Sequence, residues 1–327
     1  MKKIILSVLF TLLILLLIGI GFNVHFVSNL ISNDKTYDSC LSIDKENELL
    51  IVNKNQKIKI LQLSDIQINN YFEVARSFDI AKEAIERTSP DLIVLTGDNL
   101  NEMAWGIHLK RLINFMDSFG IPWAPVYGNH DYRVKMLSIK RQNKMFENSK
   151  YCLFKKGSVE NSNGNYCYNI KKADKLIYSI ICMDSKEKGF EPAHLTWYEN
   201  KINNSKQLNG GNIVPSLVFF HIPIEELQYA YDLYLEKPEV GNGDIGEPLS
   251  FQDINIGLYD KAKELGSTKA FIFGHDHVNT LHIKYQDIMF CYGLKTGRTS
   301  YYDDEIQGAC LYTINEDLSL TTEKIYI

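Results

Sequence analysis

The chain has 327 residues, of which 45% are hydrophobic and 12% aromatic. This composition can fill the core of one large α/β domain or of two small ones. The net charge is −5, and no basic stripe with interleaved aromatic residues occurs. A nucleic-acid backbone is therefore not the expected partner, whereas a small phosphate ester is compatible with this charge.

The N-terminus carries a long uncharged segment. Residues 4–22 follow Lys2 and Lys3 and contain no charged side chain, which is enough length for a helix to cross a bilayer. The next basic residue is Lys35, so we expect the N-terminus in the cytoplasm and the rest of the chain outside it. We therefore predict that residues 1–22 form a membrane anchor. The alternative is a cleaved signal segment, which would make the protein secreted.

Five apolar runs share one design after a polar stretch. Residues 23–57 lack periodicity and predict a tether followed by the first strand that leads into the domain. Each later run is short, rich in β-branched or aromatic residues and ends in Asp, Asn or His, which is typical of buried strands. These runs are residues 58–65, 91–98, 123–131, 216–223 and 270–277.

Helices are predicted between the first strands. Val74, Phe78, Ala81 and Ile85 have the spacing of an amphipathic helix, and a second helix is expected over about 101–119. Alternating strands and helices indicate an α/β fold with parallel strands. Ligands of such sheets collect outside the carboxyl ends of the strands, so the polar residues that end the five runs should meet there.

The remaining sequence predicts a second sheet and surface loops. The segments YCLFKKG, NYCYNI and KLIYSIICMDS indicate strands, and HLTWYENKI indicates a short helix. Residues 236–256, rich in Gly, Pro and acids, predict a surface loop near the mouth of the site. Residues 58–327 are expected to form one domain. Cys152 and Cys167 flank a polar turn and could form a disulfide outside the cytoplasm, whereas Cys182 and Cys310 are expected to be buried thiols.

The residues at the strand ends have the chemistry of metal ligands. Two adjacent divalent cations need carboxylate, amide and imidazole ligands, with one carboxylate shared between them. The candidates are Asp65, Asp98, Asn129, His221, His275 and His277. Taken singly, each has a plainer explanation, such as an aspartate that caps a helix or a histidine in a turn. The five segments taken together favour a metal site.

These segments resemble the motifs of the calcineurin-like metallophosphoesterases, in the single-domain branch related to purple acid phosphatases. The family order of D-x-H, G-D, G-N-H-D/E, a lone His and G-H-x-H stands in this chain as Asp65-Ile66-Gln67, Gly97-Asp98, Gly128-Asn129-His130-Asp131, His221 and Gly274-His275-Asp276-His277. The resemblance covers roughly residues 58–315. It implies a four-layer α/β/β/α sandwich of two mixed sheets flanked by helices.

The resemblance also implies roles for these residues. Two divalent ions (Mn, Fe, Zn or Mg, with Mn favoured) would be held by Asp65 and His277 at the first position, by Asn129, His221 and His275 at the second, and by Asp98 between them. A metal-bridging hydroxide would hydrolyse a phosphomonoester or phosphodiester. His130 would assist the leaving group and Asp131 would orient His130.

One residue departs from the family pattern. Gln67 stands where the first motif has a histidine, and an amide oxygen is a weaker ligand than imidazole toward iron or zinc. Gln67 could bind the first metal directly, hold a water molecule that binds it, or leave the first position weak. The alternative function is a degenerate, non-catalytic metal-binding or receptor-like domain. Ile68 replaces the tyrosine of the purple enzymes, so no charge-transfer colour is expected.

Other histidines and aromatic residues receive simpler interpretations. His108 is expected at the solvent edge of a helix, and His194 and His282 are expected to be structural. Arg298 and the aromatic residues after the last motif could contact a substrate phosphate or ring, or could pack on the surface; these aromatics are Tyr292, Tyr301 and Tyr302.

Overall fold

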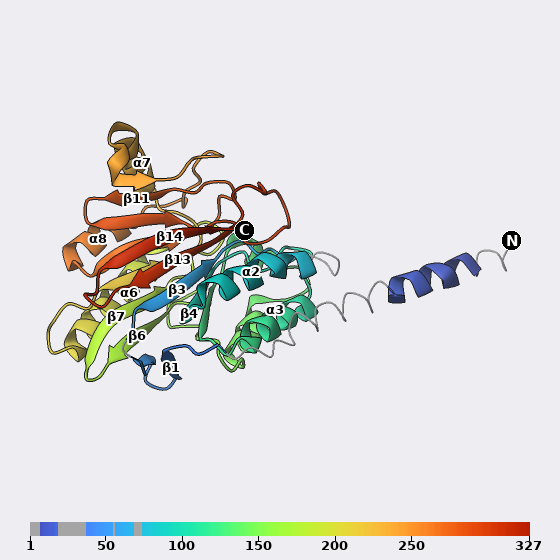
Figure 1. The fold of residues 1–327 in the computed structure, drawn as a ribbon, viewed down its shortest axis with the longest axis horizontal. Coiled ribbons are helices and arrows are strands. Elements are labelled where there is room, and N and C mark those ends of the chain that lie inside the picture. Colours follow the sequence, from blue (N-terminus) through green and yellow to red (C-terminus); the bar gives the residue numbers. More distant parts are fainter. Residues whose placement is uncertain (1–6, 19–36, 55, 69–73) are drawn as a thin grey trace.

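The computed structural model describes residues 7–18, 37–54, 56–68 and 74–327 (Figure 1). Two mixed sheets pack against each other, and helices cover their outer faces, as the resemblance implies. The α/β class and the two flanked sheets are thus confirmed.

The smaller sheet has five strands in the order β14-β13-β3-β4-β5. Its strands β3, β4 and β5 are parallel neighbours, and β13 runs antiparallel to both β3 and β14. Helices α2 and α3 supply apolar side chains to the core on this side of the molecule. The bounds are β3 (Ile58–Leu63), α2 (Val74–Thr88), β4 (Leu92–Thr96), α3 (Gly106–Ser118), β5 (Trp123–Val126), α4 (Asn129–Tyr132), α5 (Ile139–Glu147), β13 (Gly308–Ile314) and β14 (Leu320–Tyr326).

The larger sheet has nine strands in the order β1-β2-β6-β7-β8-β10-β12-β11-β9. Its central strands β7, β8, β10 and β12 are parallel, and helices α6, α7 and α8 lie on its outer side. The bounds are β1 (Leu41–Asp44), β2 (Leu49–Val52), β6 (Tyr166–Lys172), β7 (Lys175–Cys182), α6 (Pro192–Leu208), β8 (Ser216–Phe219), α7 (Glu226–Glu236), η1 (Pro238–Val240), β9 (Gly241–Asn242), α8 (Leu258–Leu265), β10 (Thr268–Phe273), β11 (His282–Tyr285) and β12 (Ile288–Tyr292).

The central strands are apolar on both faces because both faces are covered. On β10, Ile272 belongs to the core between the sheets, and its neighbours Phe271 and Phe273 belong to the core under α6, α7 and α8. Successive side chains of a strand point to opposite faces, so a strand between two cores reads as a continuous apolar run. Each such side chain stabilises the fold by about 1.5–3 kcal/mol through burial. This burial fixes the direction in which the strand ends point.

Several elements differ from the sequence-based prediction. The expected tether folds in part, because β1 and β2 form a hairpin at the edge of the larger sheet. The predicted strand YCLFKKG is wrong: it contributes only a bridge between Cys152 and Trp123, after the helix α5 that the prediction missed. Residues 236–256 contain η1 and β9, and they contact the segment after β10 through hydrogen bonds to Asn279.

The suggested disulfide between Cys152 and Cys167 is not formed. All six cysteines are buried and free. Cys152 packs in the core between the sheets, whereas Cys167 packs in the core on the far side of the larger sheet. The two thiols therefore face opposite sides of the sheet, and a polar turn between them in sequence does not bring them together. Cys182 and Cys310 are buried thiols, as predicted.

The predicted membrane segment lies largely outside the described residues. Residues 7–18 form a helix, and residues 1–6 and 19–36 are not described. Within the parts of the chain that are described, no helix has both the length and the apolar character needed to cross a bilayer. Anchoring and location outside the cytoplasm stay predictions.

His282 gives the fold a dependence on pH. Its Nε2 donates to the carbonyl oxygen of Tyr292 (3.0 Å), and burial, reinforced by Lys324, lowers its pKa to about 3. Between the ordinary histidine pKa of about 6.5 and this value, the unfolded chain binds a proton that the folded chain rejects. The free energy of unfolding should therefore fall by up to about 1.4 kcal/mol per pH unit on acidification through this window.

Urea unfolding of the full chain at about pH 6, 5 and 4 measures this slope. The His282→Gln variant keeps a donor for Tyr292 but cannot titrate, so its free energy of unfolding should fall less steeply with pH. Parallel slopes for the two proteins would contradict the assignment.

Candidate metal centre

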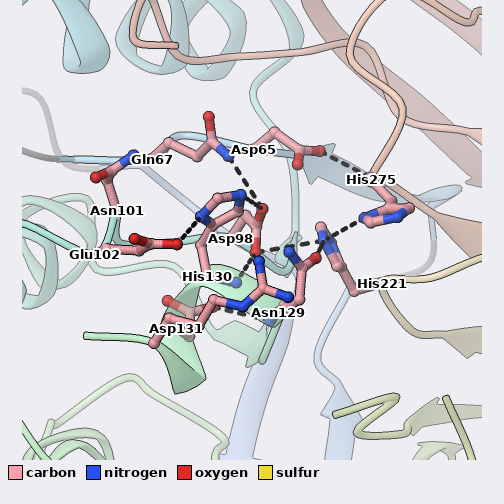
Figure 2. A network of polar contacts seen from close by, with 12 residues as sticks. Asp65, Gln67, Asp98, Asn101, Glu102, Asn129, His130, Asp131, His221 and His275 are labelled. Atoms are coloured by element: carbon pink, nitrogen blue, oxygen red, sulfur yellow. Dashed lines mark hydrogen bonds and ion pairs between the residues drawn. The ribbon is translucent and has the colours of Figure 1, made fainter. Parts of the chain in front are cut away.

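The predicted ligands follow the carboxyl ends of five strands from both sheets. Asp65 follows β3, Asp98 follows β4, Asn129 follows β5, His221 follows β8, and His275 and His277 follow β10. Figure 2 shows that Asp98, Asn129, His221 and His275 point toward one another. The structure thus brings together residues that lie far apart in the chain, from Asp65 to His277.

The backbone at the centre is constrained. Asp65 (φ 52°), Gln67 (φ 48°), Asp98 (φ 48°) and His275 (φ 84°) adopt the left-handed region, which costs free energy for residues other than glycine. At Gly128, an added Cβ would lie 2.2 Å from Oδ1 of Asp98. Only glycine allows so close an approach, and the strained positions aim the ligands at one point.

Four ligand atoms meet at the second position. Nδ1 of His221 donates to the carbonyl oxygen of Thr96 (2.8 Å), so Nε2 is the atom left to face the site. From this Nε2, Oδ1 of Asn129 lies at 3.1 Å, Nδ1 of His275 at 3.3 Å and Oδ1 of Asp98 at 3.4 Å. The neutral imidazole, the amide oxygen and the carboxylate all offer lone pairs, so this set fits a cation.

The charges of these groups respond to one another. Burial opposes the protonated form of His221, yet the Asp98 carboxylate raises the pKa of His221 to about 9. Burial also opposes ionisation of Asp98, but His221 holds the pKa of Asp98 at about 2. Burial and the charge of His221 lower the pKa of His275 to about 4. Without a metal, a proton on His221 therefore supplies the positive charge that balances Asp98, and a bound cation would displace this proton.

At the first position, one buried carboxylate oxygen accepts no hydrogen bond. Oδ1 of Asp65 is buried and accepts no hydrogen bond, and it lies 3.5 Å from Nε2 of His277. The other ring nitrogen of His277 donates to the carbonyl oxygen of Tyr301 (3.0 Å), and the Tyr301 ring stacks on the imidazole. Ligand atoms of Asp65, Asp98 and His277 all lie within 4.8 Å of one another. A buried carboxylate oxygen that accepts no hydrogen bond is costly, and a cation would satisfy it, so these three residues fit a metal.

Gln67 is held by hydrogen bonds on both ends of its amide. Its Nε2 donates to Oδ2 of Asp98 (3.0 Å), and its Oε1 accepts from Nζ of Lys295 (3.1 Å). The reverse orientation would set the amide N–H groups against an ammonium and the oxygen against a carboxylate. Lys295 is itself buried, and burial lowers its pKa to about 8, which leaves the ammonium charged at neutral pH.

His130 lies at the rim with two acids beside it. Its ring is 28% exposed, with Nε2 3.8 Å from Oδ2 of Asp98 and Nδ1 3.5 Å from Oε1 of Glu102 (Figure 2). Asp131, which was predicted to orient His130, instead binds backbone: its carboxylate accepts from the amides of Gly128, Asn99 and Leu100. Burial and the Asp98 charge raise the pKa of Asp131 to about 7. Glu102 is the acid that lies next to the ring.

His108, His194, Arg298 and Tyr292 lie in hydrogen-bonded positions. His108 is buried, with its Nδ1 accepting from the amide of Trp105, so the predicted place at the solvent edge is wrong. His194 is buried and hydrogen-bonded to Ser162, in keeping with a structural role. Arg298 donates to Gln307, and Tyr292 donates to Asp276.

Lys295 and Glu102 were missed by the sequence analysis. Lys295 follows β12, a sixth apolar run with the same design, whose polar end lies three residues further on. Its place just after an apolar run was the one feature of the sequence that could have marked Lys295 as a residue of the site. Glu102 lies four residues after Asp98 in a polar loop, and no pattern in the sequence distinguishes it.

Known proteins resemble this chain in sequence and in fold. The family model for calcineurin-like phosphoesterases matches residues 58–279. The chain is 25% identical over 293 residues to the probable inactive purple acid phosphatase 28 of Arabidopsis thaliana, covering 74% of this chain and 71% of that protein. It is 24% identical over 303 residues to the probable inactive purple acid phosphatase 29 of the same plant, covering 76% and 74%.

A solved structure has the same fold. A dimetal phosphatase from Danio rerio superposes with a TM-score of 0.52 at 12% identity, covering 84% of this chain and 100% of that chain. The matched segment holds five strands of the two sheets that end at the site, and it takes up most of the chain. The chain therefore belongs to the calcineurin-like phosphoesterase family.

Proposed function

We propose that this protein is a metal-dependent hydrolase of a phosphomonoester or phosphodiester. The observation that carries the proposal is the convergence of Oδ1 of Asn129, Nδ1 of His275 and Oδ1 of Asp98 on Nε2 of His221, at 3.1–3.4 Å. Asp65 and His277 form a second cluster with Asp98, and the family implies two divalent ions at these positions. Bound ions would supply Lewis acidity toward the phosphoryl oxygens and would make a water molecule more acidic.

Residues next to the ligands would donate a proton and hold the ligands in place. His130 lies at the rim with its ring 28% exposed and is placed to give a proton to the departing oxygen. Glu102 lies 3.5 Å from Nδ1 of His130 and so helps to hold the ring in place for that transfer. Asp131 ties the segment after β4 to α4 and so keeps Asp98 and Asn129 in register.

The part of the substrate beyond the phosphate has a candidate place. Tyr132, on the same short helix α4 as Asn129 and His130, lines a cavity of about 310 Å³. Lys186, Lys188 and Phe190 also line it. The two lysines are paired with acids of the lining, Lys186 with Glu191 and Lys188 with Asp253. A group with a flat portion would suit the aromatic side chains of this cavity.

The alternative is a metal-binding domain without catalysis. Two observations favour it: Gln67 presents an amide N–H to Asp98, and the matched plant proteins are named probable inactive. The other predicted ligands and His130 are present, and for this reason we prefer the hydrolase.

Turnover of generic esters tests the proposal. The full chain, supplied with MnCl₂, should release nitrophenol from p-nitrophenyl phosphate or from bis-p-nitrophenyl phosphate. EDTA should abolish the release and excess Mn²⁺ should restore it. No release by a folded protein that binds Mn²⁺ would favour the non-catalytic alternative. A panel of nucleotides, sugar phosphates and lipid head groups would then identify the substrate class.

A further inference from the structure

The loop after β12 clamps the loop that carries Asp65 and Gln67. Lys295 and Ser64 form a parallel bridge, and the amide of Thr296 donates to the carbonyl oxygen of Ser64 (2.8 Å). The hydroxyl of Thr299 donates to the carbonyl oxygen of Gln67 (2.6 Å). The Gln67 backbone is thus held at the same time as its side-chain amide, so turning the amide oxygen toward a metal would break several contacts.

The ammonium of Lys295 is fixed at this point. The residue is 2% exposed, and Nζ donates to the carbonyl oxygen of Asp65 (2.9 Å) as well as to Oε1 of Gln67. A buried amine that is hydrogen-bonded twice has little freedom to leave. The place that the family gives to a histidine ligand therefore presents a hydrogen-bond donor, and a positive charge lies directly behind it.

We infer that Lys295 and Gln67 make the first metal position weak and exchangeable, while the second position retains its full ligand set. This inference rests on the proposed function only in assuming that divalent metal ions bind at these two positions. The first position lacks one ligand, shares Oδ2 of Asp98 with the Gln67 amide, and lies near a like charge in a poorly solvated interior. The second position keeps all four of its predicted ligands, and Oδ1 of Asp98 there also accepts from the backbone amide of His130.

The inference makes Lys295 a positioning residue that acts through Gln67. An ion at the second position should survive dialysis, whereas an ion at the first should be lost. An activity that needs both ions would then keep rising with free metal concentration after the tight, second position is already full.

A Mn²⁺ titration of the full chain, with free Mn²⁺ followed by its electron paramagnetic resonance signal, tests this. The wild type should show one tight and one weak ion, with affinities at least roughly 10-fold apart. Lys295→Met removes the charge and frees Oε1 of Gln67, and it should raise the weak affinity roughly 10- to 100-fold, the range typical of groups behind the ligands. Lys324→Met is the matched control, because this amine contacts Asn242 on β9, and it should change neither class.

Equal affinities for two ions in the wild type, or an unchanged weak class in folded Lys295→Met, would overturn the inference. If Lys295→Met does not fold, Gln67→His makes the same test by supplying an imidazole, and an unchanged weak class would again overturn it. The titration uses no substrate, so a protein without turnover still yields a result. Absence of any Mn²⁺ binding would contradict both this inference and the proposed function.

Discussion

Replacing Asp98 with asparagine is expected to lower kcat by roughly 10⁴–10⁶-fold, the scale seen when one member of a cooperative catalytic set is removed. The carboxylate is buried, lies 3.4 Å from Nε2 of His221 and accepts from the Gln67 amide and the His130 backbone. The amide would remove the one negative charge that both metal positions share. Nitrophenyl ester turnover at saturating Mn²⁺, with Mn²⁺ stoichiometry measured in parallel, checks the expectation.

Asp117→Asn is the matched control for this variant. Its carboxylate, at the end of α3, accepts from the Trp123 indole and from the Ser149 hydroxyl. Its loss should lower the free energy of unfolding and leave kcat and Mn²⁺ stoichiometry unchanged. Near-normal turnover in Asp98→Asn would contradict the proposal that the reaction takes place at this site.

Replacing His130 with glutamine should lower kcat by roughly 10²–10⁴-fold for alkyl phosphates, the usual contribution of a general acid. The loss should be much smaller for nitrophenyl esters, because nitrophenolate leaves without a proton. Release of inorganic phosphate from the two ester classes measures the difference. Glu102→Gln should show the same dependence on the leaving group with a smaller loss, because it changes only the carboxylate at Nδ1.

An equal loss on both ester classes would contradict a role for His130 in protonating the leaving group. Mn²⁺ binding by His130→Gln should match that of the wild type, since the ring stands 3.8 Å from Asp98 and outside the set around His221. A variant that loses metal would show that the ring helps to hold the ions instead.

The strand ends were predictable because burial and polarity change abruptly there. The run before Asp98 is buried on both faces, and the run before Asp65 is buried apart from Lys59, as a sheet covered on both sides requires. Their convergence follows from parallel pairing of β3, β4 and β5 and of β8 and β10. The order of the motifs was therefore enough to anticipate the neighbourhood of the ligands.

The neighbours of the ligands could not be anticipated from the sequence. Whether Gln67 faces a metal depends on Lys295, more than two hundred residues away, and no local pattern links them. The role given to Asp131 failed for a similar reason, since its carboxylate is taken by backbone amides of two loops whose approach only the fold reveals. The edge hairpin of β1 and β2 depends on pairing with β6, and the sequence predicted only a single entry strand in this region.

The most direct test is a crystal of the full chain grown with MnCl₂ and measured for manganese anomalous scattering. We expect a strong peak enclosed by Asp98, Asn129, His221 and His275, and a weaker peak, sensitive to the MnCl₂ concentration, beside Asp65 and His277. A map without density among the first four residues, in a protein that keeps this fold, would contradict this expectation.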